Sequence, residues 1–189
     1  MTGVDIAHLT ALYRDTDDPW NFRTSSYERA KFAATLDALP GRRFAHVLEL
    51  GCGNGELGRR LALRADRYTG LDAVPRALDA ARRAVPGGRF VEAMLPCALP
   101  DNGGSPYDLI VLSEILYFLD PGGLAALARR IDGDAPMARL LAVTWTGPSG
   151  NGIEGPAAVA AFSAASRRRA TPGPFTDRYR IDRFGQVAP

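Results

Sequence analysis

The sequence predicts a single α/β domain in which helices cover both faces of a mostly parallel sheet. Its 189 residues match the usual length of one domain. A content of 46% hydrophobic and 23% charged residues is sufficient for a buried core. Short apolar segments alternate with helical segments of about ten residues, and such an alternation requires crossover connections that make neighbouring strands parallel.

Two helices are predicted before the first strand. Apolar residues recur at helical spacing over residues 5–14 and stop at Pro19, which cannot continue a helix. A second helix begins after one of the three capping residues at positions 24–26 and ends at Pro40 and Gly41. We expect an N-terminal helical lid or cap over residues 1–43 and an α/β core over residues 44–189.

The first predicted strand is FAHVLEL, an apolar run that ends at glycines, as buried parallel strands do. Four more strands follow the same pattern, at residues 67–71, 89–91, 107–112 and 138–145. Helices are expected between and after them at residues 56–64, 75–84, 121–131 and 156–166.

The C-terminal part of the sequence shows weaker patterns. The glycine and proline cluster TGPSGNGIEGP predicts a loop near the functional edge of the sheet. TPGPF is expected to form a turn, and the alternating YRIDRF a last strand at the sheet edge. The basic run Arg167 to Arg169 is interpreted as a solvated face.

Composition excludes several classes of protein. The formal net charge of +2 argues against nucleic-acid or anionic-membrane binding by bulk electrostatics. Two cysteines, Cys52 and Cys97, are too few for a disulfide framework and fit a reducing cytoplasm. No apolar run has the length of a membrane span, and the N-terminus has no signal-peptide pattern. We therefore expect a soluble, cytoplasmic protein.

The chemistry is concentrated where the first strand ends, in Glu49-Leu50-Gly51-Cys52-Gly53-Asn54-Gly55. Alternating glycines at a strand's carboxyl end let a ligand approach the main chain closely. The same region also satisfies the GxGxxG pattern of dinucleotide-binding proteins. Glu49 favours a cationic ligand over a pyrophosphate, because a carboxylate would repel the phosphates. Asp72, at the end of the second strand, can accept both hydroxyls of a ribose and fits either interpretation.

These motifs resemble class I S-adenosylmethionine-dependent methyltransferases, through ELGCGNG, then LD after the second strand and YDLIVLSE at the fourth. More narrowly, DPWNFRTSSYERAKFAATL and SEILYFL resemble the nodulation-type N-methyltransferases, whose members act on the free amine of a deacetylated chitooligosaccharide. The resemblance implies a Rossmann-like fold, S-adenosylmethionine as cofactor and S-adenosylhomocysteine as product.

The resemblance also implies roles for individual residues. Those expected to contact the cofactor are Gly51, Gly53 and Gly55 along the methionine and ribose, Glu49 near the methionine ammonium, Asp72 at the ribose, and Ser113 after the fourth strand. Family members often have an Asp after the third strand for the adenine amino group, but this sequence has Met94 there, so Met94 and Leu95 are expected to hold adenine by apolar contact.

The N-terminal aromatic residues have two interpretations. Trp20, Arg23 and Tyr27 are expected to close over the cofactor, with Arg23 pairing with the methionine carboxylate and the rings beside the sulfonium. Alternatively, the aromatic side chains fasten the N-terminal helices to the sheet as core residues.

Glu114 and Tyr117, just beyond the fourth strand, are the expected catalytic residues. That strand neighbours the first in the expected sheet, so Glu114 should face the sulfonium side, orient an incoming ammonium and accept its proton. Alternatively, Glu114 caps the following turn or pairs with a surface arginine.

The sequence thus predicts methyl transfer from S-adenosylmethionine to a small acceptor, most simply an amine, by in-line displacement without a metal. Alternatives are an oxygen or carbon acceptor, a non-catalytic cofactor-binding protein, or an NAD-dependent oxidoreductase. The last is disfavoured because the sequence offers no obvious Tyr/Lys proton relay, its one lysine, Lys31, lying in the N-terminal helix.

Overall fold

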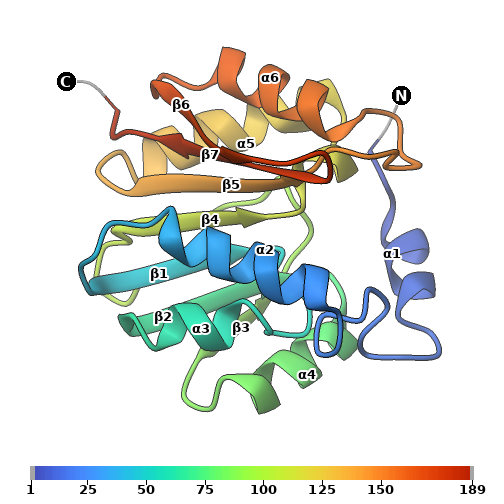
Figure 1. The fold of residues 1–189 in the computed structure, drawn as a ribbon. Coiled ribbons are helices and arrows are strands. Elements are labelled where there is room, and N and C mark those ends of the chain that lie inside the picture. The colour runs from blue at the N-terminus through green and yellow to red at the C-terminus, as the bar shows by residue number, and fades with distance from the viewer. Residues whose placement is uncertain (1–2, 188–189) are drawn as a thin grey trace.

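Within residues 3–187, which the computed structural model describes, the chain forms one seven-stranded sheet with helices on both faces (Figure 1). The strands are β1 (Phe44–Leu50), β2 (Ala65–Asp72), β3 (Arg89–Glu92), β4 (Leu109–Ser113), β5 (Arg139–Trp145), β6 (Ala170–Phe175) and β7 (Tyr179–Phe184). The helices are α1 (Ile6–Leu12), α2 (Ser26–Asp37), α3 (Gly58–Ala62), α4 (Pro75–Ala84), the 3-10 helix η1 (Leu116–Phe118), α5 (Pro121–Asp134) and α6 (Gly155–Ala165).

The strands are arranged in the order β3-β2-β1-β4-β5-β7-β6. The first five are parallel, whereas β7 is antiparallel to both of its neighbours. Chain order runs outward from β1 to β3 and then resumes at β4 on the other side of β1. This confirms the predicted α/β class and the predicted neighbourhood of the first and fourth strands.

Alternating residues of the central strands pack into two separate hydrophobic cores, one on each face of the sheet. On one face, Val47 and Val111 pack with residues of α2 and α3. On the other face, Leu48 and Leu112 pack with α5 and α6. The two helix layers are visible in front of and behind the sheet in Figure 1. Both faces of the central strands are therefore buried, which explains why these strands appear in the sequence as continuous apolar runs.

The C-terminal hairpin corrects two predictions. TPGPF, expected to be a turn, lies within β6, so YRIDRF forms β7 between β5 and β6 and does not lie at the sheet edge. Proline is tolerated in β6 because an edge strand leaves one row of backbone groups unpaired. The pairing of β6 with β7 is also irregular between Pro172 and Phe175.

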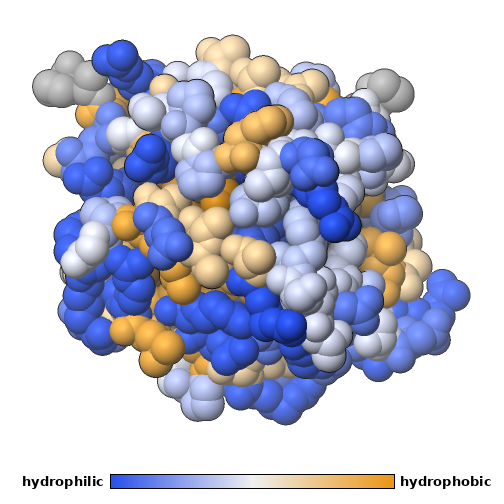
Figure 2. Space-filling model, in the orientation of Figure 1, coloured by the Kyte–Doolittle hydropathy of each residue, from blue (hydrophilic) through white to orange (hydrophobic). Residues whose placement is uncertain are grey.

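The surface view shows hydrophilic residues around smaller, separate hydrophobic areas (Figure 2). Among the described residues, no helix combines the length and apolar character needed to cross a membrane.

In the basic run before β6, Arg167 and Arg169 are exposed, as predicted for a solvated face, whereas Arg168 is not. The side chain of Arg168 is fully buried, and its Nε donates to Oδ1 of Asp132 on α5 at 2.7 Å. Its other nitrogens donate to main-chain oxygens near the end of α5, including that of Ala135 at 2.7 Å, and to Gly185 at 3.0 Å. The carbonyl groups at the end of a helix lack partners within the helix, so a buried guanidinium can satisfy several of them together.

We predict that Arg168→Ala lowers the free energy of unfolding by about 3 to 5 kcal/mol, because Asp132 is left as an unpaired buried charge. Urea denaturation followed by circular dichroism measures this change. The matched control is Arg169→Ala, which removes an exposed arginine next in sequence and should leave stability unchanged. Equal effects of the two substitutions would contradict the structural role of Arg168.

Candidate functional site

A cavity of about 620 Å³ opens at the carboxyl ends of the parallel strands. Its walls come from the N-terminal segment, from the turns after β1, β2, β3, β4 and β5, and from the turn between β6 and β7. The predicted site residues that line it are Trp20, Tyr27, Glu49, Gly51, Gly53, Asp72, Met94, Leu95, Ser113, Glu114 and Tyr117. The structure therefore brings together residues from four strand ends and the N-terminal segment.

Two predicted site residues lie outside the cavity lining. Arg23 makes a two-pronged contact with Asp17, at 2.6 and 3.1 Å, so the N-terminal loop itself occupies its guanidinium. Gly55 faces α4, where an added Cβ would lie 2.9 Å from the Cα of Ala81. Gly55 therefore permits close packing between loop and helix and does not contact the cavity.

Gly51 is the residue on which the turn after β1 depends. Its φ of +79° lies in the left-handed region, and a Cβ there would lie 1.9 Å from Cγ2 of Ile115. The turns after β1 and β4 consequently approach each other closely beneath the cavity. No larger residue fits without moving one of these turns.

Glu49 is buried near the end of β1, with 1% of its surface exposed. Its Oε2 accepts a hydrogen bond from the Tyr68 hydroxyl at 2.6 Å, while Oε1 has no hydrogen-bond partner among the described residues. Burial raises the pKa of Glu49 to about 8, against the opposing effects of the neighbouring Tyr68 and Ser113 hydroxyls. A buried carboxylate with a free oxygen favours a cationic ligand, whose charge would restore ionisation.

Asp72 at the end of β2 is oriented by the main chain. Oδ2 accepts from the N–H of Gly53 at 2.8 Å, and Oδ1 accepts from the N–H of Val74 at 3.0 Å. Burial raises the pKa of Asp72, and the backbone N–H groups oppose that rise. Each oxygen keeps a further lone pair, so the carboxylate can still accept two hydroxyl groups.

The N-terminal segment closes this side of the cavity. Nδ2 of Asn54, in the glycine turn, donates to Oδ1 of Asp18 at 2.9 Å. The ring of Trp20 stacks on Phe22 with centroids 5.5 Å apart and meets Tyr13 edge-on at 5.6 Å. Trp20 lines the cavity yet remains 40% exposed, whereas Tyr13 is buried. Trp20 thus combines contact with its aromatic neighbours and access to the cavity.

Glu114 follows β4 and uses both of its oxygens. Oε1 accepts from Nζ of Lys31 at 2.6 Å. Oε2 accepts from the Tyr117 hydroxyl at 2.9 Å and from the main-chain N–H of Trp145 at 2.6 Å. Its φ of 59° is uncommon for a residue with a side chain. Strained backbone of this kind is often found where a side chain must be aimed at a functional site. The alternative expectation, in which Glu114 pairs with a surface arginine, is wrong about the partner, because Glu114 pairs with Lys31.

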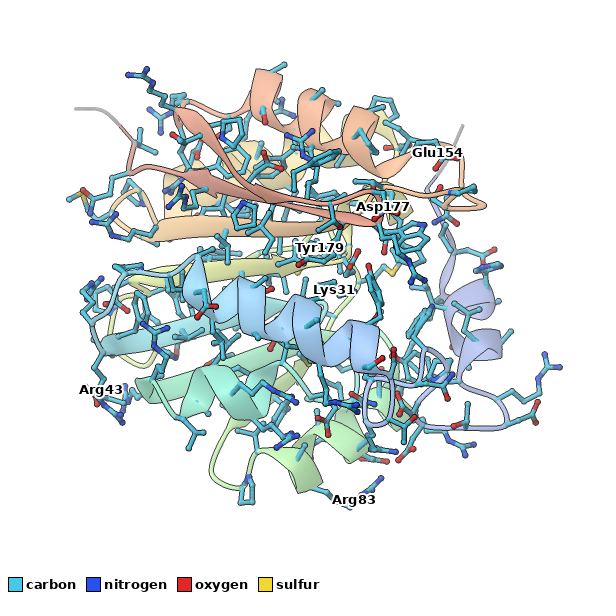
Figure 3. All side chains as sticks on the ribbon, in the orientation of Figure 1. Lys31, Arg43, Arg83, Glu154, Asp177 and Tyr179 are labelled. Carbon is cyan, nitrogen blue, oxygen red and sulfur yellow. The ribbon has the colours of Figure 1, made fainter. Side chains whose placement is uncertain are left out.

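Lys31 also contacts Glu28, at 3.2 Å from Oε1 and 3.0 Å from Oε2. We name Glu28, Lys31 and Glu114 the Lys31 cluster. Burial opposes the charge of Lys31, but the two carboxylates raise its pKa. With all three groups ionised the cluster carries a net charge of −1 at the cavity wall (Lys31 is labelled in Figure 3).

Several cavity residues were absent from the sequence prediction: Tyr13, Glu28, Lys31, Asn54, Trp145 and Arg178. Lys31 lies in the second N-terminal helix, as predicted, but it was not among the predicted site residues. A signal was available, since Lys31 is the one lysine in a chain rich in arginine. Nothing local in the sequence indicates that α2 lies against the end of β4.

Comparison with known proteins identifies relatives of this chain. The model of the Nodulation protein S (NodS) family matches residues 5–129. Nodulation protein S of Rhizobium tropici is 33% identical over 104 residues, covering 54% of this chain and 44% of that protein. Trans-aconitate 2-methyltransferase of Paracidovorax citrulli is 34% identical over 124 residues, covering 64% of this chain and 43% of that enzyme.

The fold has a counterpart among solved structures. The N-methyltransferase NodS from Bradyrhizobium japonicum WM9, in complex with S-adenosyl-L-homocysteine, superposes with a TM-score of 0.77 at 20% identity, covering 97% of this chain and 99% of that one. At this identity the likeness shows the fold alone. The chain spans about half the length of the curated relatives it matches. Because the family model extends over more than half of the sequence, the chain belongs to the Nodulation protein S family.

Proposed function

We propose that this protein transfers a methyl group from S-adenosylmethionine to the nitrogen of a small-molecule amine. The observation that carries the proposal is the buried carboxylate of Glu49, with a free oxygen beside the glycine turn and one strand away from Asp72. Membership of the Nodulation protein S family supports it, as does the likeness to a NodS N-methyltransferase bound to S-adenosyl-L-homocysteine.

The residues present fit the cofactor. Glu49 would hold the methionine ammonium, which supplies the cation that its unpaired oxygen lacks. Asp72 would accept the ribose hydroxyls through its remaining lone pairs. Met94 and Leu95 would cover the adenine by apolar contact, and Ser113 would lie beside the methionine. Residues 1–43, in which Trp20 and Tyr27 line the cavity, would act as the lid.

The chain's own contribution to the reaction is mainly orientation and control of a proton. S-adenosylmethionine supplies an electrophilic methyl group when it is bound. Glu114 would hold the acceptor ammonium and take its proton, which exposes the nitrogen lone pair. Lys31 and the Tyr117 hydroxyl fix the Glu114 carboxylate in place, so that the acceptor meets it in one orientation.

Other functions are less well supported. A carboxylate acceptor, as the name of the Paracidovorax citrulli relative suggests for that enzyme, would be repelled by the net charge of the Lys31 cluster if it lay at Glu114. A pyrophosphate in the glycine turn would lie near the Glu49 carboxylate, which disfavours a nicotinamide dinucleotide. A non-catalytic cofactor-binding protein would bind S-adenosylhomocysteine without turnover, so a transfer assay separates it from the proposed enzyme.

The remaining expectations concern partners and compartment. A formal net charge of +2 supports a small-molecule acceptor over nucleic acid or an anionic membrane. The two cysteines are free, which fits a reducing, cytoplasmic environment.

We predict that Asp72→Ala weakens S-adenosylhomocysteine binding by about 10-fold to 100-fold, since charge-assisted hydrogen bonds to the ribose are lost. Isothermal titration calorimetry measures the dissociation constant. Thermal melting checks that the turn, which also loses its Gly53 and Val74 hydrogen bonds, remains folded. The control is Asp79→Ala on the exposed side of α4. An unchanged dissociation constant in folded Asp72→Ala would remove this residue from the site.

We predict that Glu49→Gln makes the ligand-free protein more stable than wild type as pH rises from 5 to 8. The pKa of Glu49 is about 8 in the folded state against an ordinary value of 4.5. The contribution of this group to the free energy of unfolding is therefore fully present below pH 4.5, and it is lost as pH rises to 8 and the buried carboxyl ionises. The difference between variant and wild type should grow by at least about 1 kcal/mol across this range in urea unfolding. Parallel pH profiles would show that Glu49 titrates normally.

We predict that Glu114→Gln leaves the affinity for S-adenosylhomocysteine unchanged and lowers the methylation rate by roughly 10²-fold or more, because glutamine cannot accept the acceptor's proton. The pH optimum should rise as solvent takes over deprotonation. Radiolabel transfer to a panel of small amines, with exposed Glu92→Gln as the control, measures both effects. Wild-type turnover of Glu114→Gln at pH 7 would eliminate the acid–base role.

A further inference from the structure

Arg178 is the one arginine among the described residues that lines the cavity. It lies in the turn between β6 and β7, whose neighbouring residues Asp177 and Tyr179 are labelled above Lys31 in Figure 3. Tyr179, the first residue of β7, pairs with Trp145, the last residue of β5. Because β7 is antiparallel to β5, this turn lies at the carboxyl end of the parallel strands, where the cavity opens.

The side chain of Arg178 is held by aromatic rings. Its Cζ lies 4.2 Å from the centre of the Tyr27 ring and 5.7 Å from that of Trp145. The main chain is fixed too, since the Arg178 carbonyl accepts hydrogen bonds from the Thr146 N–H at 3.1 Å and the Tyr27 hydroxyl at 3.4 Å. A guanidinium stacked in this way loses less entropy when it binds a ligand than a free surface arginine does.

Arg178 is an exposed residue of the cavity wall, and its charge has no carboxylate partner among the described residues. Within residues 3–187, no carboxylate oxygen comes within 4.0 Å of its guanidinium nitrogens. Lys31, the cavity's other permanent cation, contacts two carboxylates. Arg178 therefore offers the cavity free N–H donors arranged in the fork that suits an oxyanion.

The sheet order separates Arg178 from Glu49 and Asp72, the residues proposed to hold the methionine and ribose of the cofactor. In the sheet, β4 and β5 lie between β1 and β7, so three strand spacings of about 4.8 Å each separate the glycine turn's strand from that of Arg178. Trp145 joins Arg178 to the acceptor side, since its N–H donates to Glu114 while its ring lies against Arg178. Tyr27 likewise contacts both Arg178 and Lys31.

We propose that Arg178 binds an oxyanionic group of the methyl acceptor, a carboxylate or a phosphate, while Glu114 holds the amine of the same molecule. This inference rests on the proposed function and narrows it. The acceptor is then a small amine that also carries a negative charge. An amine without an oxyanionic group would leave Arg178 without a ligand partner, and a simple anion would leave the Lys31 cluster facing a like charge.

The test measures ligand binding to protein saturated with S-adenosylhomocysteine. Calorimetry compares two pairs of probes, phosphoethanolamine with ethanolamine and β-alanine with propylamine. The member of at least one pair that carries an oxyanionic group should bind about tenfold or more tightly than the member that lacks one. The pair with the larger ratio distinguishes phosphate from carboxylate.

Two variants complete the design. Arg178→Gln should abolish the preference and leave the dissociation constant of S-adenosylhomocysteine unchanged. Arg183→Gln should retain the preference, because this exposed arginine of β7 lies outside the cavity lining.

Three results would overturn the inference. The first is wild-type protein that prefers neither probe with an oxyanionic group, and the second is a preference that survives in Arg178→Gln. The third is weaker S-adenosylhomocysteine binding in Arg178→Gln, which would assign this arginine to the cofactor carboxylate. Wild-type protein that fails to bind S-adenosylhomocysteine would instead contradict the proposed function itself, and with it the role of Arg178.

Discussion

The site depends on the point between β1 and β4 at which the order of strands in the sheet reverses. From β1 the chain builds outward to β3, and it then returns to place β4 on the opposite side of β1. The connections that leave the two strands therefore diverge, and a cavity remains between them at the carboxyl edge. Parallel pairing brings the carboxyl ends of β1 to β5 to this one edge, so Glu49, Asp72 and Glu114 line the same cavity although they are far apart in sequence.

The N-terminal segment completes the cavity through polar contacts that cross from one part of the chain to another. Lys31 of α2 bonds Glu114 after β4, and Asp18 bonds Asn54 in the glycine turn. Buried ion pairs recover their desolvation penalty only partly, so their main effect is on specificity of position. The cavity wall formed by α2 is thus aligned with β4 by charge, while the neighbouring Phe32 anchors the same helix in the core.

The sequence was sufficient for features set by local pattern. Apolar runs ending at glycines located the parallel strands, and Glu49 and Asp72 were recognised because strand ends in such folds converge. β6 was missed because its prolines and glycine match a turn, although an edge strand accepts them. The pairing of Lys31 with Glu114, 83 residues away, depends on packing that no local pattern encodes. Arg23 was assigned to the ligand because its competitor Asp17 lies in a loop of unpredictable conformation.

The two sides of the cavity also differ in where they lie along the chain. The glycine turn, Asp72 and Glu114 fall within the span matched by the Nodulation protein S model, whereas Trp145 and Arg178 lie beyond residue 129. Loops after the later strands tolerate change because they do not carry the sheet. In this protein, however, the main-chain N–H of Trp145 donates to Glu114, and the Trp145 ring faces Arg178. A change in the loop after β5 or in the turn before β7 would therefore alter the surroundings of Glu114, the proposed base. The residues proposed for the cofactor and the proposed base Glu114 therefore lie within the span that the family model matches, whereas Arg178, the proposed contact for the acceptor's oxyanion, lies beyond it, so membership of the family does not bear on Arg178.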